Sequence, residues 1–251
     1  MISILFSSRK KDNPNHNLKV LLESFIHFTT PEERLQCEFL IKFDDDDDEH
    51  EIELEYLETI SEKIGIRTFT WARNGGRNSL HEVQSLLYGY IHRDSKWIHV
   101  IADDFIFTRS GFVSDILNTD NHFTFIGKET FPVTQSIAPC FSRKFLDACC
   151  GYFGTQPNAD GFSSGINESF IQKYGIDLGI NIPTYYVRTG QASTENWESN
   201  HNKAMKDFEM LNRIYQLMAK NIYLCIKDSD NDQDIHAFRP NIYPDIANHK
   251  Q

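Results

Sequence analysis

The chain has 251 residues, of which 40% are hydrophobic and 13% aromatic, enough to bury a sizeable core as one compact unit. Its formal net charge of −11 comes almost entirely from residues 44–58, which hold ten acidic residues and no Lys or Arg. Because nucleic-acid binding needs a basic surface, this charge argues against DNA or RNA as a partner. No apolar run approaches the roughly 20 residues that cross a bilayer, so no membrane span is expected.

The cysteines favour a reducing compartment. They are odd in number, and none forms a CxxC pair or a zinc-type spacing with histidine. The residues before Arg9 also lack the basic start and longer apolar segment of a signal peptide. Together these features predict a cytoplasmic protein with free thiols. The five cysteines are Cys37, Cys140, Cys149, Cys150 and Cys225.

Strands and helices alternate in the first half of the chain. Apolar runs bounded by turn residues predict strands, and apolar residues at helical spacing predict the helices between them. Four strands joined through three helices imply parallel crossovers and a sheet covered on both faces, hence an α/β fold. The predicted strands are 2–7, 36–43, 67–71 and 97–102, and the predicted helices are 18–29, one from about residue 51, and 80–91.

The second half is less regular. A long helix over 201–220 carries apolar residues on one face, and the Asp-rich stretch from Asp228 predicts a loop followed by an extended tail. The sequence contains no internal repeat. The other predicted elements are strands over 123–127 and 184–187 and helices over 143–150 and 166–174.

Carboxylates follow two of the predicted strands directly. Asp44 and Asp45 end the strand 36–43, and Asp103 and Asp104 end the strand 97–102. In a parallel sheet the carboxyl ends of the strands border the ligand crevice, so these acids could meet a ribose, a base or a divalent cation. Single acids after strands are also common turn and capping residues, and only their joint order favours a nucleotide-and-metal site.

The order of these motifs resembles the GT-A glycosyltransferases of the inverting, family-two-like kind. The resemblance rests on Ser7-Ser8-Arg9, Asp44-Asp45, Asn74-Gly75-Gly76-Arg77-Asn78 and Ala102-Asp103-Asp104, and it covers the first 110 residues best. It implies a Rossmann-like GT-A domain with a mixed, mainly parallel central sheet flanked by helices. The chain departs from the family at Ala102, where an Asp is frequent, so the motif is Ala-Asp-Asp rather than Asp-x-Asp.

The resemblance assigns roles to residues at the strand ends. It implies a nucleotide-sugar as co-substrate and Mn²⁺ or Mg²⁺ as the cofactor on its diphosphate. Hard oxygen ligands suit such a cation, which offsets the charge that builds on the leaving pyrophosphate. The implied roles are Ser7, Ser8 and Arg9 near base and ribose, Asp44 or Asp45 on the base or ribose, Arg77 near the nucleotide, Asp103 near ribose or metal, and Asp104 on the metal.

Inverting transfer needs a base that takes the proton from the acceptor hydroxyl. The resemblance makes Asp160, shortly before a predicted helix, the first choice and Glu168 the fallback. The position of Asp160 would equally suit a helix N-cap. A third metal ligand often comes from the C-terminal region in this family, and His201 is the candidate here.

The resulting hypothesis is a metal-dependent glycosyltransferase, a hexosyl- or related transferase, that moves a sugar from a nucleotide-sugar donor to a hydroxyl of a saccharide or related acceptor in glycan biosynthesis. Within one GT-A domain, residues 1–110 would form the nucleotide-sugar-binding half, 111–199 the acceptor-binding half, and 200–251 a C-terminal helix and tail. Inversion or retention, the donor and acceptor, and the oligomeric state are left open.

Two alternatives belong to the same fold. A sugar nucleotidyltransferase usually has a glycine-rich loop after its first strand, and residues 7–12 contain no glycine. A non-catalytic nucleotide- or calcium-binding module would account for Ala102. The spacing of Asp44, Asp46 and Asp48 imitates a calcium loop, but Glu49 stands where that loop needs glycine.

Overall fold

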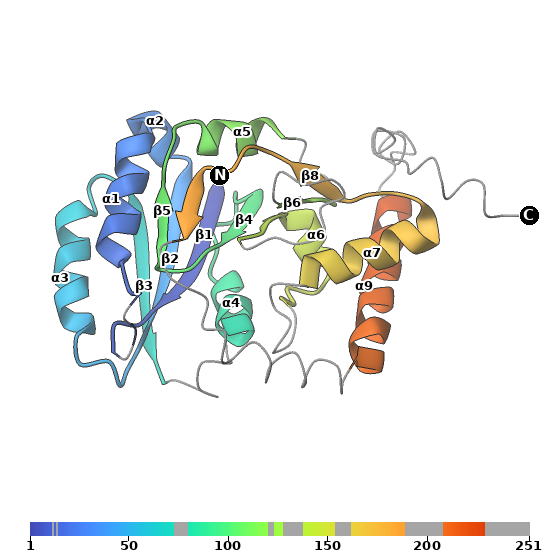
Figure 1. Ribbon diagram of the computed structural model, residues 1–251, viewed down its shortest axis with the longest axis horizontal. Helices are drawn as coiled ribbons and strands as arrows, with labels where there is room; N and C mark the ends of the chain where they lie inside the picture. Colours follow the sequence, from blue (N-terminus) through green and yellow to red (C-terminus); the bar gives the residue numbers. More distant parts are fainter. Residues whose placement is uncertain are drawn as a thin grey trace, which may run out of the picture.

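The computed structural model describes residues 1–11, 13, 15–72, 80–119, 123–127, 138–153, 162–188 and 208–228. A seven-stranded sheet with the order β3-β2-β1-β4-β7-β6-β8 forms its centre, and β5 and β9 form a separate two-stranded sheet. Helices flank the strands, with α1 and α3 at one end of the molecule and α7 and α9 at the other (Figure 1). The fold class is therefore α/β with a mixed, mostly parallel central sheet, as predicted.

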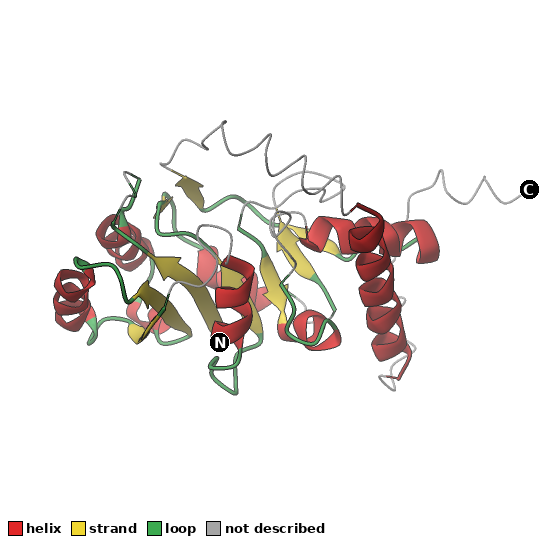
Figure 2. Ribbon diagram, turned by 90° about the horizontal axis from the view of Figure 1, so that it is seen from below, coloured by secondary structure: helices red, strands yellow, loops and turns green. Residues whose placement is uncertain are grey.

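The strands are short except in the first half of the chain. Seen from below, they form the middle of the molecule with helices around them (Figure 2). The strands are β1 (Ile2–Ser8), β2 (Cys37–Asp44), β3 (Gly65–Trp71), β4 (Trp97–Val100), β5 (Phe105–Phe107), β6 (Phe125–Gly127), β7 (Cys140–Ser142), β8 (Gly179–Asn181) and β9 (Tyr186–Arg188).

The helices bury apolar residues in the core, except for α2, which has none buried. The helices are α1 (Leu18–Phe28), α2 (Pro31–Arg34), α3 (His50–Ile60), α4 (Leu80–Tyr88), α5 (Phe112–Asn118), α6 (Arg143–Ala148), α7 (Phe162–Tyr174) and α9 (Phe208–Asp228). The prediction of a helix over 201–220 is confirmed from residue 208 onward, but the helix continues to Asp228. Residues 201–207 lie outside the described part of the chain.

The parallel half of the sheet sets the position of the strand ends. β1 pairs in parallel with both β2 and β4, and β2 with β3, so the four carboxyl ends share one edge. All eight residues of β2 are buried, as expected for a strand covered on both faces. β4 pairs with β7 antiparallel, and from there the sheet becomes mixed.

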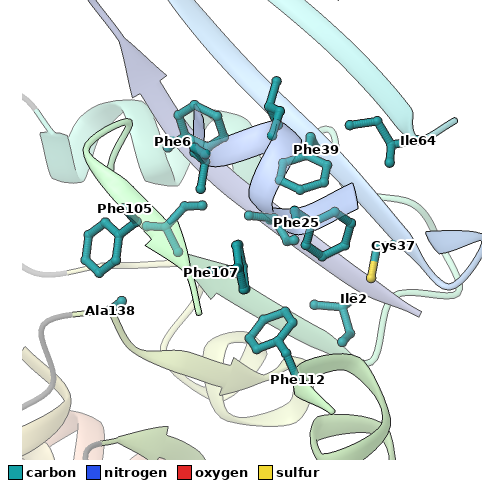
Figure 3. Packing of buried hydrophobic residues seen from close by; sticks show 14 of the residues in the cluster. Ile2, Phe6, Phe25, Cys37, Phe39, Ile64, Phe105, Phe107, Phe112 and Ala138 are labelled. Carbon is teal, nitrogen blue, oxygen red and sulfur yellow. The ribbon is translucent and has the colours of Figure 1, made fainter. Parts of the chain in front are cut away.

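One hydrophobic cluster lies on each side of the sheet. The first joins α1, α5 and β5 to alternate residues of β1 and β2. Phe25 is its centre, with ring centroids 4.9 Å from Phe39 and 5.3 Å from Phe107 in edge-on geometry (Figure 3). The second cluster joins the other face to α4, α6, α7 and α9. The two clusters therefore cover both faces of the central sheet.

Candidate active site

Residues following β1, β2 and β4 meet at the carboxyl edge of the sheet. Ser8 is the last residue of β1 and Asp44 the last of β2, and Asp103 and Asp104 form the turn after β4. All four side chains are buried, with 7% or less of each residue exposed. The structure thus brings the acids of two distant segments into one polar cluster.

Arg9 links the two acidic segments. Its Nη1 donates to Asp44 Oδ2 at 3.0 Å, and its backbone N–H donates to Asp103 Oδ2 at 3.3 Å. Its guanidinium also pairs with Asp46, through Nη2 to Oδ2 at 3.2 Å. The hydrogen bond that Arg9 donates to Asp46 is the main reason that the pKa of Arg9 is raised, and the hydrogen bond to Asp44 adds to the shift. Arg9 therefore contacts Asp44 through its guanidinium and Asp103 through its backbone.

Behind Arg9 lies a buried group of His16, Glu53, Ser8 and Asp103. His16 Nε2 is 2.8 Å from Glu53 Oε1, 2.9 Å from Ser8 Oγ and 3.7 Å from Asp103 Oδ2. Ser8 Oγ donates to Asp103 Oδ2 at 3.3 Å. Asp103 is thereby held by a hydroxyl, a backbone N–H and a nearby imidazole.

Burial and charge shift the pKa values in this group. Burial raises the pKa of Asp103 to about 6, although His16 and the Arg9 N–H oppose the shift. Burial alone would lower the pKa of His16, but the hydrogen bond to Glu53 and the charge of Asp103 outweigh it, so the pKa of His16 is raised. Both groups therefore bind a proton more tightly in the folded protein than when exposed to water.

Lys42 adds a buried positive charge beside Asp44. It lies two residues earlier on β2, so the two side chains share a face of the sheet, and their charged groups form an ion pair. Lys42 is only 2% exposed. A buried carboxylate is tolerated when it is paired, and Asp44 has partners of opposite charge in both Lys42 and Arg9.

Asp47, in the loop between β2 and α3, hydrogen-bonds the segment that follows β1. Its Oδ2 accepts backbone N–H groups of Lys10 at 2.7 Å and Lys11 at 3.3 Å, and its Oδ1 accepts that of Glu49 at 3.3 Å. Burial would raise the pKa of Asp47, but these three donors hold it below its ordinary value. Asp48, by contrast, has a side chain 94% exposed, which does not fit a ligand of a calcium loop.

The other predicted site residues are placed as follows. Ser7 is half-buried and pairs with Lys42 across β1 and β2. Asp45 is exposed, and its backbone N–H donates to Trp71 O at 3.3 Å, so Asp44 is the member of that pair within the cluster. Glu168 is exposed on α7, which packs against α9. Arg77, Asp160 and His201 lie outside the described residues.

The carboxylate oxygens at the turn after β4 suit a hard divalent cation. Asp103 and Asp104 are adjacent buried carboxylates, and Mg²⁺ is commonly held by one or two carboxylates together with substrate phosphates and water. Within the described ranges, no group of three or more His, Cys, Asp or Glu side chains could hold a metal ion by itself. The residues present fit a cation site that the substrate completes.

Three cluster residues were not predicted from the sequence. Glu53 occupies a buried position of α3, one turn before Leu57, where an apolar residue is usual, and this was a usable signal. Lys42 is a charge within an otherwise buried strand, two residues from an acid, which was a second signal. His16 lies in a polar turn before α1 and carries no pattern that distinguishes it from a solvent-exposed residue.

Comparison with known proteins identifies the fold. No protein-family profile and no curated protein sequence match the chain. The mannosyltransferase PcManGT from Pyrobaculum calidifontis, in complex with GDP-Man and Mn²⁺, matches 96% of the chain over 81% of its own length, with a TM-score of 0.59 at 9% identity. S. aureus TarS in complex with UDP matches 93% of the chain over 68% of its own length, with a TM-score of 0.55 at 13% identity.

A nucleotidyltransferase is also similar in structure. The 4-diphosphocytidyl-2C-methyl-D-erythritol synthase from Anaerococcus prevotii matches 82% of the chain over 96% of its own length, with a TM-score of 0.50 at 9% identity. In another structure of S. aureus TarS, the chain spans only 39% of that protein's length. The chain therefore has the GT-A-like fold of nucleotide-diphospho-sugar transferases. Within the parts described, no helix is both long and apolar enough to cross a bilayer.

Proposed function

We propose that the protein is a metal-dependent glycosyltransferase that moves a sugar from a nucleotide-sugar donor to a hydroxyl of a saccharide or related acceptor. The observation that carries the proposal is the buried charged cluster of Arg9, Asp44 and Asp103 at the carboxyl edge of β1, β2 and β4. In open α/β sheets this edge is where nucleotides bind. The free cysteines support a cytoplasmic location.

The nucleoside would lie between the ends of β1 and β2. Asp44, with Ser7 and Ser8 beside it, would accept hydrogen bonds from the base or ribose, and Asp103 would contact the ribose or the metal. Arg77 would add a contact to the nucleotide. Because Asp44 is fixed by Lys42 and Arg9, its carboxylate is already oriented before the ligand arrives, which reduces the entropy lost on binding.

Arg9 would change partners when the donor binds. Its pair with Asp44 is buried, with side chains 15% and 9% exposed, whereas the side chain of its other partner, Asp46, is 51% exposed. Water screens the exposed pair more strongly, so phosphate oxygens displace Asp46 more easily than Asp44. Arg9 would then hold the diphosphate with its planar guanidinium while remaining anchored to Asp44.

The reacting groups would lie near the turn after β4. Asp104, with Asp103 beside it and His201 as a third ligand, would hold Mn²⁺ or Mg²⁺, which offsets charge on the leaving diphosphate when bound. Asp160 would take the proton of the acceptor hydroxyl, with Glu168 as the alternative. Residues 1–110 would bind the donor, residues 111–199 the acceptor, and residues 200–251 would complete the domain.

A sugar nucleotidyltransferase is the second candidate. It is favoured by the similarity to the Anaerococcus prevotii synthase, almost all of which the chain covers. It is disfavoured by residues 7–12, at the end of β1 and beyond, whose sequence contains no glycine and includes Arg9, Lys10 and Lys11. The two activities differ in their products, because glycosyl transfer releases a nucleoside diphosphate and nucleotidyl transfer releases pyrophosphate.

Thermal shift with UDP-, GDP- and dTDP-sugars, each with and without Mn²⁺, tests the proposed site. A donor at a hundred times its Kd stabilises the folded state by about 2.7 kcal/mol, which raises Tm by several degrees. We expect a metal-dependent rise for one donor series, lost in Asp44→Asn and kept in the exposed control Asp48→Asn. The proposal would be refuted if calcium alone stabilised the protein, or if none of the nucleotide-sugars did.

A further inference from the structure

Helix α9 buries only one of its faces. Gly165 of α7 lets the helices approach so closely that an added Cβ there would lie 2.4 Å from the Tyr215 ring. The opposite face of α9 is exposed along its whole length. The residues packed against α6 and α7 recur every three to four positions: Leu211, Tyr215, Ala219, Ile222 and Ile226.

The exposed face of α9 carries an apolar row. Met210, Leu217 and Leu224 are 52%, 59% and 46% exposed. They are spaced by seven residues, which places them on one line of the helix about 21 Å long. Single exposed apolar residues need no explanation, but three that recur along one line of an otherwise polar helix face call for one.

A basic row runs beside the apolar row. Arg213, Lys220 and Lys227 each follow an apolar row member by three residues, so they lie along the same side of it. Basic and apolar residues in parallel along one exposed helix face are typical of helices that lie at a membrane surface.

A stacked pair of tyrosines connects the region beside the basic row of α9 to α7. Tyr223 stacks on Tyr174 with ring centroids 4.0 Å apart and planes 4° apart. Lys227 Nζ lies 5.2 Å from the Tyr223 centroid, and Lys173 Nζ lies 5.5 Å from the Tyr174 centroid. Tyrosine has an apolar ring and a polar tip, which suits the boundary between water and lipid. Lys173 adds a fourth cation to the row.

Charge is distributed unequally along the molecule. Helix α3, which belongs to the acidic segment 44–58, lies at the end of the molecule opposite α9 (Figure 1). The two acids of α9, Glu209 and Asp228, are confined to its first and last turns. An anionic surface would therefore repel the α3 end and attract the basic row of α9, against the negative charge of the Asp-rich stretch that begins at Asp228.

We propose that the exposed face of α9 docks on the surface of an anionic lipid bilayer. The apolar row enters the boundary of the acyl chains, and the basic row and Lys173 contact the lipid headgroups, with their aliphatic stems covering the apolar row. This inference is independent of the proposed transferase activity. A second copy of the chain fits the face less well, because three half-exposed side chains bury too little area for a stable dimer, and an antiparallel α9 pair would oppose the two basic rows.

Sedimentation with vesicles tests the docking. The purified full chain is mixed with vesicles of phosphatidylcholine alone, or of phosphatidylcholine and phosphatidylglycerol in equal amounts, at low and high salt. We expect pelleting with the anionic vesicles only, weakened by salt. Lys220→Ala and Lys227→Ala should each lower the partition coefficient about fivefold, and Leu217→Ser should lower it further. Circular dichroism checks that these surface variants remain folded.

Matched controls carry the same changes elsewhere on the surface. Leu86→Ser removes a leucine that is 52% exposed on α4, and Lys19→Ala removes a lysine with a side chain 67% exposed on α1. Both should pellet like the wild type. Equal pelleting with the two kinds of vesicle, or an equal loss of pelleting in variants and controls, would overturn the proposal. So would a dimer in sedimentation equilibrium that Leu217→Ser abolishes, if no vesicle binding accompanies it.

Discussion

The buried pair of His16 and Glu53 offers a quantitative test of the cluster behind Arg9. The pair is 2.8 Å apart, with side chains 8% and 10% exposed, so water screens it little. Glu53→Gln keeps the shape and one hydrogen bond but removes the charge. Hydrogen bonds to charged groups contribute about 1.5–3 kcal/mol and neutral ones about 0.5–1.5, so the substitution should cost about 1–2 kcal/mol.

The cost should depend on pH in a definite direction. The pKa of His16 is raised in the folded protein, because the pull of Glu53 and Asp103 exceeds the opposing effect of burial. The stabilisation from charged His16 is therefore complete below its unfolded pKa of about 6.5 and is lost as pH rises through the higher folded value. The difference between wild type and Glu53→Gln should be largest near pH 6 and shrink toward pH 9.

Urea unfolding followed by circular dichroism at several pH values measures this difference. The control is Glu23→Gln, which removes a charge from the exposed Lys19–Glu23 pair, with side chains 67% and 55% exposed. Such surface pairs contribute only about 0.3–0.5 kcal/mol. If Glu53→Gln costs no more than the control, or costs the same at every pH, the cluster does not hold His16 in its charged form.

Three further substitutions test the framework around the site by the same unfolding assay. Asp47→Asn should cost about 2 kcal/mol at pH 7, and because the pKa of Asp47 is lowered in the folded state, the cost should begin to shrink as pH drops below about 4. A cost as large at pH 3 as at pH 7 would contradict this. Gly165→Ala should cost about 1–3 kcal/mol, since the new methyl group must displace the Tyr215 ring. An unchanged free energy of unfolding would show that α7 and α9 are not in close contact. Phe25→Ala should lower the free energy of unfolding by about 3–5 kcal/mol. A decrease of less than about 1 kcal/mol would show that the Phe25 ring is not part of the core.

The first half of the fold could be predicted from the sequence because its elements are long and strongly patterned. β1 and β2 are apolar runs of seven and eight residues, and α1 repeats its apolar residues at helical spacing. The sequence did not predict β5, β7 and β8, which have three residues each and form because neighbouring strands pair with them. Nor did it predict the short helices α2 and α5.

The end of α9 was missed although the signal was present. The prediction ended at residue 220, yet Ile222 and Ile226 continue the buried row of Leu211, Tyr215 and Ala219. The apolar spacing in the sequence could therefore have predicted that the helix continues beyond residue 220.

In the site, the sequence predicted that acids of β2 and β4 would share an edge, because parallel register fixes where the strands end. It could not predict that Arg9 would join Asp44 to Asp103, since that contact depends on the path of a turn. The burial of Glu53 and His16 depends likewise on how α3 and the turn before α1 meet. Which of Asp44 and Asp45 faces the cluster was also a matter of local geometry, and the structure assigns it to Asp44.

Product analysis with purified protein, Mn²⁺ and candidate sugar donors tests the proposed transfer reaction itself. We expect release of a nucleoside diphosphate from the donor that stabilises the protein, and loss of that release in Asp104→Asn while the folded state is retained. Release of pyrophosphate from a nucleoside triphosphate and a sugar phosphate, with no turnover of any nucleotide-sugar, would contradict it.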